Sequence, residues 1–275
     1  MFLVPGEWFT VDNAESGKMF RSELDRLAGV PPPRVLLATD FDGTLAPIVQ
    51  DPGAARAVPA ALRALGDLQA RLARVTILSG RATDALEGLV PVPGVRLRGD
   101  YGLGRPTPEE IALLDRLAGE LAPLAGRHPG AKVERKPGSL SVHYRDAPEA
   151  GPAIEKAASA AAERLGLRWH RGKLVVEVLP PRAGKERALR ADMDEARCEA
   201  VVFAGDDVGD TGCFALLAGL DMPHLAIGVA SPEAPSDLFR DCDSVLDGPA
   251  SFAAFLTSLA AWSARPGPAD PGSGG

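Results

Sequence analysis

The feature that most constrains the fold is a short apolar stretch followed at once by two carboxylates, within residues 35–44. Residues 35–38 are all apolar and too few for a helix, as in a parallel strand whose two faces are both covered. Asp40 and Asp42 come where this strand would end, and ligands of parallel sheets bind beyond the carboxyl ends of the strands. The stretch therefore predicts a buried strand of an α/β fold that presents acidic side chains at a binding edge.

The paired carboxylates and the turn behind them indicate a metal and a phosphate. Two carboxylates this close repel each other, so both stay ionised only with a cation between them, and Mg²⁺ prefers oxygen ligands. Gly43 permits a turn whose backbone N–H groups face an anion, and the Thr44 hydroxyl adds a further donor. A calcium loop of the EF-hand type is excluded, because the glycine comes at the fourth loop position and the sixth is required. A purely structural acidic turn stays open on these residues alone.

Composition points to a globular protein that acts on a small molecule. Of 275 residues, 45% are hydrophobic and 24% are charged, which is ordinary for one or two domains. The net charge of -7 argues against nucleic acid or an anionic membrane surface as partner. Three cysteines without a C-x-x-C pair predict neither a disulfide framework nor a zinc site. Since neither a signal peptide nor an apolar stretch of ~20 residues is evident, we expect a cytoplasmic protein without membrane contact, and a monomer.

A second buried strand carries another candidate residue. Leucines at helical spacing predict a helix over residues 59–73, and residues 75–78 then form a strand that ends at Ser79. Ser79 is thereby expected at the same edge of the sheet as Asp40, and Gly80 allows close approach of a ligand. The Ser79 hydroxyl is a candidate to hold a phosphoryl oxygen, next to the N-terminus of the following helix.

The middle of the chain reads as an inserted domain. Residues 106–181 are expected to form a helix, two strands, a second helix and two more strands, an order that suits a helix-backed antiparallel cap. After residue 181 the alternation of helices and buried strands resumes. The expected division is a leader helix within residues 1–33, with Met19, Phe20, Leu24 and Leu27 on its apolar side, an α/β core over 34–105 and 182–264, the cap over 106–181, and a disordered tail over 265–275.

Four groups of polar residues, each at a strand end or a helix start, follow one another along the chain: Asp40 with Asp42, Ser79, Lys185, and Asp206 with Asp207 and Asp210. Over residues 34–260 the chain thereby resembles the haloacid dehalogenase-like phosphohydrolases. Within that superfamily it is most similar to the trehalose-6-phosphate phosphatase family. The segments that carry this closer resemblance are residues 40–48, 79–81, 134–145 and 172–177, of which the last two belong to the expected cap.

The resemblance implies a Mg²⁺-dependent phosphatase that hydrolyses trehalose 6-phosphate through an aspartyl-phosphate. It implies Asp40 as the nucleophile, Asp42 as general acid and base, and Lys185 as the cation that neutralises the phosphoryl oxygens. The implied metal ligands are Asp40, Asp42 through its backbone carbonyl, and Asp206, with Asp207 and Asp210 as supporting or alternate ligands. The implied phosphate contacts are Thr44, Ser79, Gly80 and Lys185, and the implied sugar contacts are Glu134, Lys136, Arg145 and Glu177.

Two turns depart from the pattern of that family. Residues 99–104 read Gly-Asp-Tyr-Gly-Leu-Gly where the family has Gly-x-His-Gly and an acidic residue, so one substrate contact of the family is expected to be missing. Residues 205–211 keep the carboxylates that would serve the metal. Three alternatives stay open: a capped phosphatase for sucrose phosphate or a glycosyl-phosphoglycerate, a catalytically silent binding or regulatory relative, and a merely solvated sheet face for Glu134, Lys136 and Glu177.

Overall fold

The computed structural model describes residues 19–265 except 50, 173, 232–233 and 235–236. Its core is a six-stranded parallel sheet with the strand order β10-β9-β8-β1-β2-β3. All five residues of β1 are buried between β2 and β8, which explains why residues 35–38 carry no polar side chain. The strands of this sheet are β1 (Val35–Thr39), β2 (Arg74–Leu78), β3 (Arg96–Arg98), β8 (Ala200–Gly205), β9 (His224–Ala230) and β10 (Ser244–Asp247).

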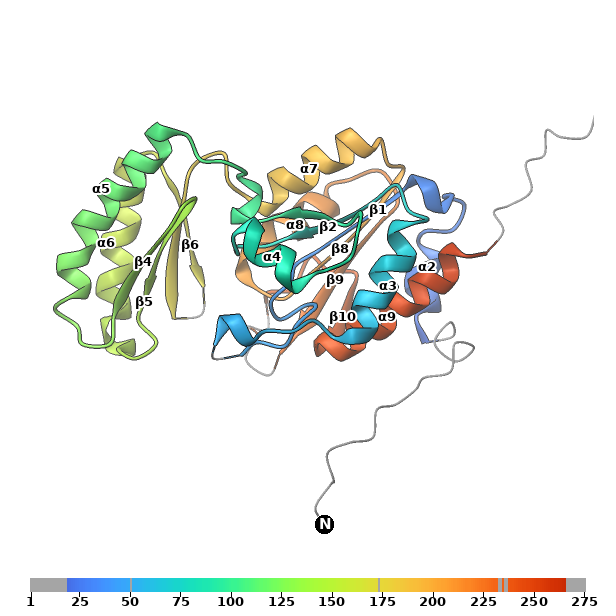
Figure 1. The fold of residues 1–275 in the computed structure, drawn as a ribbon, viewed down its shortest axis with the longest axis horizontal. Coiled ribbons are helices and arrows are strands. Elements are labelled where there is room, and N and C mark those ends of the chain that lie inside the picture. Colours follow the sequence, from blue (N-terminus) through green and yellow to red (C-terminus); the bar gives the residue numbers. More distant parts are fainter. Residues whose placement is uncertain (1–18, 50, 173, 232–233, 235–236, 266–275) are drawn as a thin grey trace, which may run out of the picture.

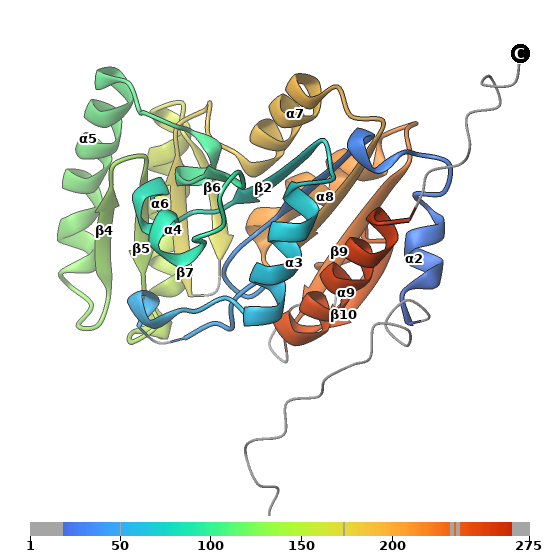
Figure 2. The ribbon, with the colours of Figure 1, turned by 45° about the vertical axis from the view of Figure 1, so that its right-hand side comes forward.

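Helices cover both faces of this sheet (Figure 1 and Figure 2). Side chains alternate along β1, so that Leu37 packs into one apolar cluster and Leu36 and Ala38 into another on the opposite face. The first cluster includes residues of α2 (Arg21–Asp25), α3 (Pro59–Gln69), α4 (Thr83–Leu89) and α9 (Gly248–Ser263), and the second includes residues of α7 (Lys185–Ala196) and α8 (Thr211–Ala218).

A second, antiparallel sheet with the order β4-β5-β7-β6 lies beside the core in both views. Two helices cover the face turned away from the core, and with this sheet they are called the cap (Figure 1). The predicted fold class, a parallel α/β core with an inserted α+β cap, is confirmed. The elements of the cap are α5 (Pro108–Ala125), β4 (Lys132–Lys136), β5 (Ser139–His143), α6 (Gly151–Arg164), β6 (Arg168–Gly172) and β7 (Val175–Leu179).

Short 3-10 helices complete the fold at the connections. Two of them matter for the site, η3 after β3 and η5 after β8. The bounds of these short helices are η1 (Pro32–Arg34), η2 (Pro52–Ala54), η3 (Asp100–Gly102), η4 (Pro148–Ala150) and η5 (Val208–Asp210).

The N-terminal segment packs as expected except at one residue. Phe20, Leu24 and Leu27 are buried, whereas Met19 is 62% exposed, so its predicted place on the apolar side is wrong. Phe20 has a non-helical backbone at the start of α2, and Met19 therefore falls outside the helical spacing. Residues 1–18 of the predicted leader, Lys173 and residues 266–275 of the predicted tail lie outside the described residues. Within the described part of the chain, no helix has the length and apolar character needed to cross a membrane.

Candidate active site

Three neighbouring strands deliver polar side chains to one edge of the core sheet. β1 pairs with β2 on one side and with β8 on the other, and all three run in the same direction. Asp40, Ser79 and Asp206 directly follow the last residues of β1, β2 and β8. They therefore meet at the carboxyl edge of the sheet. The side chains of Asp40 and Ser79 are almost fully buried, at 5% and 1% exposure. Parallel pairing thus assembles residues that are far apart in sequence.

Lys185, the first residue of α7, joins two of the carboxylates. Its Nζ donates to Asp40 Oδ1 and to Asp210 Oδ1, each at 2.8 Å, and the side chain is only 5% exposed. Burial acts to lower the pKa of Lys185, but the charges of Asp210 and Asp40 outweigh it and hold that pKa well above its ordinary value. The ammonium is therefore charged throughout the neutral range and lies against the nucleophile that the sequence predicts.

Asp40, Asp206 and Asp210 form a buried acidic cluster, in which one carboxylate oxygen of each residue lies within 4.8 Å of those of the other two. Burial chiefly raises the pKa of Asp40 to about 7, although Lys185 acts against it. Burial and the neighbouring carboxylates raise the pKa of Asp206 to about 10. Three buried carboxylates, of which Asp40 and Asp206 resist ionisation, fit a hard divalent cation that would add positive charge among them. The acidic cluster could therefore hold a metal.

The turn after β1 is shaped around this cluster. Thr44 Oγ1 donates to Asp206 Oδ1 at 3.2 Å, and Thr44 is fully buried. Gly43 has φ of 78°, and a Cβ at this position would collide with the Asp206 carboxylate. Glycine suits both the positive φ and the lack of space for a Cβ. Gly43 therefore forms the predicted turn and also makes room for the Asp206 carboxylate.

The five aspartates predicted around the metal, of which Asp42 was expected to bind through its backbone carbonyl, take different places. Asp210 Oδ2 accepts the backbone N–H groups of Asp206 and Asp207, at 3.1 and 3.2 Å, so it also shapes the η5 turn. The Asp207 carboxylate instead accepts the N–H of Val208 at 2.7 Å and caps that turn. The structure brings the side chains of Asp40, Asp206 and Asp210 together and leaves those of Asp207 and Asp42 out of the cluster.

The Asp42 carboxylate is held by Arg81, which lies in the segment 79–81 that resembles the family but was not predicted as a site residue. Arg81 Nε donates to Asp42 Oδ2 at 2.6 Å and Nη2 to Oδ1 at 2.7 Å, a bidentate pair. The guanidinium carbon also lies 5.5 Å from the centre of the Phe41 ring. The backbone N–H of Arg81 donates to Ser79 Oγ at 3.2 Å. The position of Arg81 two residues after Ser79, at a predicted strand end, could have indicated from the sequence that Arg81 lies at the site.

The core-facing side of the cap carries a row of polar residues, one from each strand. Glu134 pairs in register with Ser141, Ser141 with Glu177, and Glu177 with His170, so all four side chains share one face. The row of Glu134, Ser141, Glu177 and His170 is called the polar row below. This face lies opposite the cap helices, and Glu177 is buried against the core.

The remaining predicted sugar contacts differ in their placement. Lys136 lies on the same face, with Nζ 3.7 Å from Glu134 Oε2, and Glu134 Oε2 also lies 2.8 Å from His143 Nε2. Arg145 follows β5 and is exposed, and no ion pair joins it to any described residue. The structure therefore gathers Glu134, Lys136 and Glu177 and leaves Arg145 apart. His170 and Ser141, which complete the row, were missed because only the strand register reveals them.

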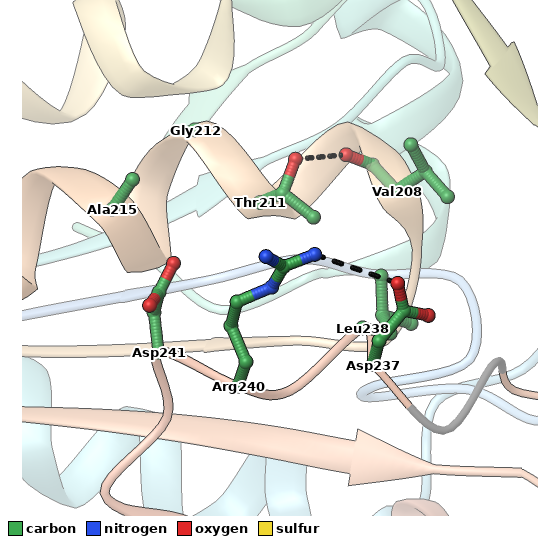
Figure 3. Close-up of a pocket in the computed structure, with 8 residues that line it drawn as sticks. All are labelled: Val208, Thr211, Gly212, Ala215, Asp237, Leu238, Arg240 and Asp241. Atoms are coloured by element: carbon green, nitrogen blue, oxygen red, sulfur yellow. Dashed lines mark hydrogen bonds and ion pairs between the residues drawn. The ribbon is translucent and has the colours of Figure 1, made fainter.

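A separate pocket of about 460 Å³ opens between α8 and residues 237–241 (Figure 3). Arg240 lies across it with its guanidinium directed at Asp237, to which Nη2 donates at 3.4 Å. Its lining includes none of the residues predicted from the sequence for the site. The pocket is thus distinct from the acidic cluster.

Comparisons with known proteins agree with this geometry. A sequence model of the trehalose-phosphatase family matches residues 38–241. A trehalose-phosphate phosphatase of Mycobacterium avium is 33% identical over 254 residues, which are 86% of this chain and 64% of that protein. The chain thus spans just under two thirds of that relative's length.

Two solved structures have the same fold. The C-terminal domain of a Candida albicans trehalose-6-phosphate phosphatase superposes with a TM-score of 0.69 at 21% identity, covering 94% of this chain and 99% of that one. The C-terminal domain of a Candida albicans trehalose synthase regulatory protein superposes with a TM-score of 0.67 at 13% identity, covering 88% and 97%. A fold shared with a protein named as regulatory cannot decide activity, which has to be argued from the site.

Proposed function

Because the chain belongs to the trehalose-phosphatase family, we propose that it hydrolyses trehalose 6-phosphate to trehalose and phosphate with the help of Mg²⁺. The observation that carries the proposal is the buried contact of Lys185 with both Asp40 and Asp210, beside Asp206. Burying a lysine among three carboxylates costs free energy, which a purely structural turn has no reason to maintain. Binding of a phosphate and a cation at this site would account for the burial of these charges.

Asp40 is the nucleophile of this proposal. Its carboxylate oxygen forms a bond to phosphorus while the bond from phosphorus to the sugar oxygen breaks, and the electron pair stays on that oxygen. Lys185, at 2.8 Å from Asp40, stabilises both the ionised carboxylate and the charge on the phosphoryl oxygens. Ser79 offers a hydroxyl group at the same edge for orienting the phosphate, whereas the Thr44 hydroxyl donates to Asp206 and would have to turn from it to donate to the phosphate. Mg²⁺ bound by Asp40, Asp206 and Asp210 would supply the positive charge that balances these carboxylates and the phosphate.

Asp42 is the proton donor and acceptor of both steps. It gives a proton to the departing sugar oxygen, and it later takes one from the water that attacks the aspartyl-phosphate and releases phosphate. Both of its oxygens are engaged by Arg81, at 2.6 and 2.7 Å. The side chain of Asp42 must therefore leave this ion pair during the cycle, and Arg81 is then free to bind a phosphate oxygen.

The sugar is bound by the cap in this proposal. The polar row and Lys136 face the core and combine acceptors and donors that suit sugar hydroxyls. Binding energy from the distant glucose ring would align the phosphate with Asp40, and the cap would exclude bulk water. Another capped sugar-phosphate phosphatase is the second candidate, favoured by the presence of Tyr101 where the family has histidine.

Phosphate release from several sugar phosphates tests the proposal directly. We expect kcat/KM for trehalose 6-phosphate to exceed that for glucose 6-phosphate and sucrose 6-phosphate by at least about 100-fold, because glucose 6-phosphate has no second ring for the cap to bind and sucrose 6-phosphate carries its phosphate on a fructose ring with a different linkage. EDTA should abolish the activity, and Mg²⁺ should restore it. A preference for sucrose 6-phosphate would support the second candidate. No hydrolysis of any of the three sugar phosphates, with Mg²⁺ present, would favour a silent relative.

Metal removal is expected to lower the melting temperature more at pH 8 than at pH 5.5. In the metal-free protein the pKa values of Asp40 and Asp206 are raised to about 7 and about 10, so the folded state holds protons that the unfolded chain releases above pH ~4. Metal-free stability therefore falls as the pH rises through this range, whereas metal binding needs ionised carboxylates and strengthens.

Thermal unfolding with EDTA and with Mg²⁺ at the two pH values measures this effect. The Asp206→Asn variant is the control, since it loses one charged ligand and should show a smaller difference between EDTA and Mg²⁺ at pH 8. An equal difference at both pH values in the natural protein would contradict metal binding by these carboxylates.

A further inference from the structure

Tyr101 lies where the core, the cap and the two chain crossings between them meet. It belongs to η3 and has φ of 55°, an uncommon conformation for a residue of this size. Its N–H donates to the Ser79 carbonyl, and its carbonyl accepts from the N–H of Gly184, both at 2.9 Å. The backbone of Tyr101 is thus tied to the strand end that carries Ser79 and to the residue that precedes Lys185.

The side chain of Tyr101 bridges the two domains. Its ring covers Gly80, where an added Cβ would lie 2.7 Å from the ring. On the cap side the ring meets His170 edge to face, with 5.8 Å between ring centres, and its hydroxyl donates to Glu177 Oε2. Tyr101 is only 7% exposed, so this hydrogen bond is shielded from water.

Glu177 receives three donors in this arrangement. Tyr101 and His170 both bond to Oε2, the latter at 2.8 Å, and Ser141 Oγ donates to Oε1 at 3.3 Å. Burial acts to raise the pKa of Glu177, but His170, the Tyr101 hydroxyl and the charge of Lys136 outweigh it and lower that pKa to about 2. The carboxylate is ionised, and Oε1 alone keeps acceptor capacity for a ligand. The position of the Glu177 carboxylate is therefore fixed by its three hydrogen-bond donors and does not require a bound ligand.

Other polar contacts between cap and core lie nearer to solvent. At the second chain crossing, Arg182 donates to Glu110 of α5 at 2.7 and 2.9 Å, and its side chain is 53% exposed. Arg168 Nη1 lies 2.8 Å from Glu186 Oε1, but the two side chains are 42% and 25% exposed, and ion pairs with such access to water contribute little. At the β4–β5 turn, Gly138 lies against Asp100 and Leu103. Within the described residues, Asp100 Oδ1 and Ser139 Oγ are buried there without a partner, which costs free energy. The Tyr101–Glu177 hydrogen bond is thus the contact that ties the polar row of the cap sheet to the core edge, away from the chain crossings.

We propose that Tyr101 is a positioning residue, which holds the cap sheet over the acidic cluster through Glu177 and thereby determines selectivity for a sugar phosphate. The inference rests on the proposed function for its choice of substrate. While the hydrogen bond is made, the polar row keeps one position relative to Asp40, so a sugar can bind the row and present its phosphate at the same time. A phosphate ester without a sugar needs only the core edge and does not depend on this alignment.

The Tyr101→Phe variant tests the proposal, because it removes the hydroxyl and keeps the ring on Gly80. We expect kcat/KM for trehalose 6-phosphate to fall about tenfold, mainly through KM, as for the loss of one hydrogen bond to a charged group. The value for p-nitrophenyl phosphate should stay within about twofold. The matched control is Tyr144→Phe, the chain's other tyrosine. It is 2% exposed and donates to Glu155 at 2.6 Å inside the cap, so its loss should leave the ratio of the two substrates unchanged.

Small-angle X-ray scattering of the Mg²⁺-loaded, substrate-free protein gives a readout that does not depend on the substrate. Tyr101→Phe should increase the radius of gyration relative to the natural protein and to Tyr144→Phe, because the cap is released. If the natural protein fails to hydrolyse trehalose 6-phosphate, the proposed function fails while the scattering still tests the contact. An unchanged radius of gyration, an unchanged substrate ratio, or equal losses on both substrates would overturn the role of Tyr101.

Discussion

Replacing Asp40 by Asn is expected to lower kcat for phosphate release by roughly 10⁴-fold or more, the largest effect of any single substitution considered. The amide is nearly isosteric with the carboxylate but is a poor nucleophile. Its oxygen can still accept the hydrogen bond that Lys185 donates to Asp40 at 2.8 Å, so the packing around the buried lysine is kept. Loss of one charge also relieves repulsion with Asp206 and Asp210. The fold should therefore survive, as circular dichroism and thermal unfolding would show.

The matched control is Asp67→Asn, which makes the same chemical change on the exposed side of α3 and should leave kcat unaltered. A residual kcat of Asp40→Asn within about 100-fold of the natural protein would assign the nucleophile elsewhere, with Asp42 as the nearest other carboxylate in sequence.

Replacing Asp192 by Ala is expected to cause the largest loss of stability. Asp192 is fully buried on α7, where it accepts from Thr76 Oγ1 at 2.9 Å and pairs with Arg74, Arg96 and Arg98 at 3.1, 2.9 and 2.7 Å. Its removal would leave three guanidinium groups close together with no buried counter-charge. Breaking such a pair costs roughly 3–5 kcal/mol, and the lower end applies because these arginines keep some access to water. The midpoint of thermal unfolding should fall by roughly 6–12 °C.

Glu195→Ala is the control for this prediction. Glu195 contacts the same three arginines from the same helix, but its side chain is 49% exposed, so we expect a much smaller change in the midpoint. Similar losses for the two variants would mean that surface charge balance, and not the buried carboxylate, holds α7 on the sheet. Since Lys185 begins this helix, kcat of each variant should be measured below its unfolding transition.

The elements that form the site could be predicted because their sequence patterns are local. A parallel strand covered on both faces buries mostly apolar side chains until it ends, so the apolar run before Asp40 locates both the strand and the binding edge. A run without polar side chains also precedes Asp206, and in the run of residues 75–78 before Ser79 the single polar residue is Thr76, whose hydroxyl is bonded to Asp192. In the cap, the period of two separates Glu134 and Glu177 from the apolar residues of their own strands, and the register between β4, β5 and β7 then places both on one face.

The partners of these side chains could not be predicted, because they depend on register and on packing across long separations in sequence. Arg81 reaches Asp42 across 39 residues, Tyr101 reaches Glu177 across 76, and Arg74 reaches Asp192 across 118. No periodicity links residues so far apart. They meet only when parallel strands align their ends, a helix packs on the sheet, or the cap is placed over the core.

By itself, then, the sequence determined the α/β core with its inserted cap and the edge at which acidic chemistry collects, since both follow from which short segments must be buried. Only the tertiary structure decided which carboxylates share the acidic cluster. Asp210 joins Asp40 and Asp206 because the η5 turn folds it back onto Lys185, whereas Asp42 is drawn away by Arg81. The tertiary structure also decided the contact of Tyr101 with Glu177, because this contact forms only where the cap sheet faces the core.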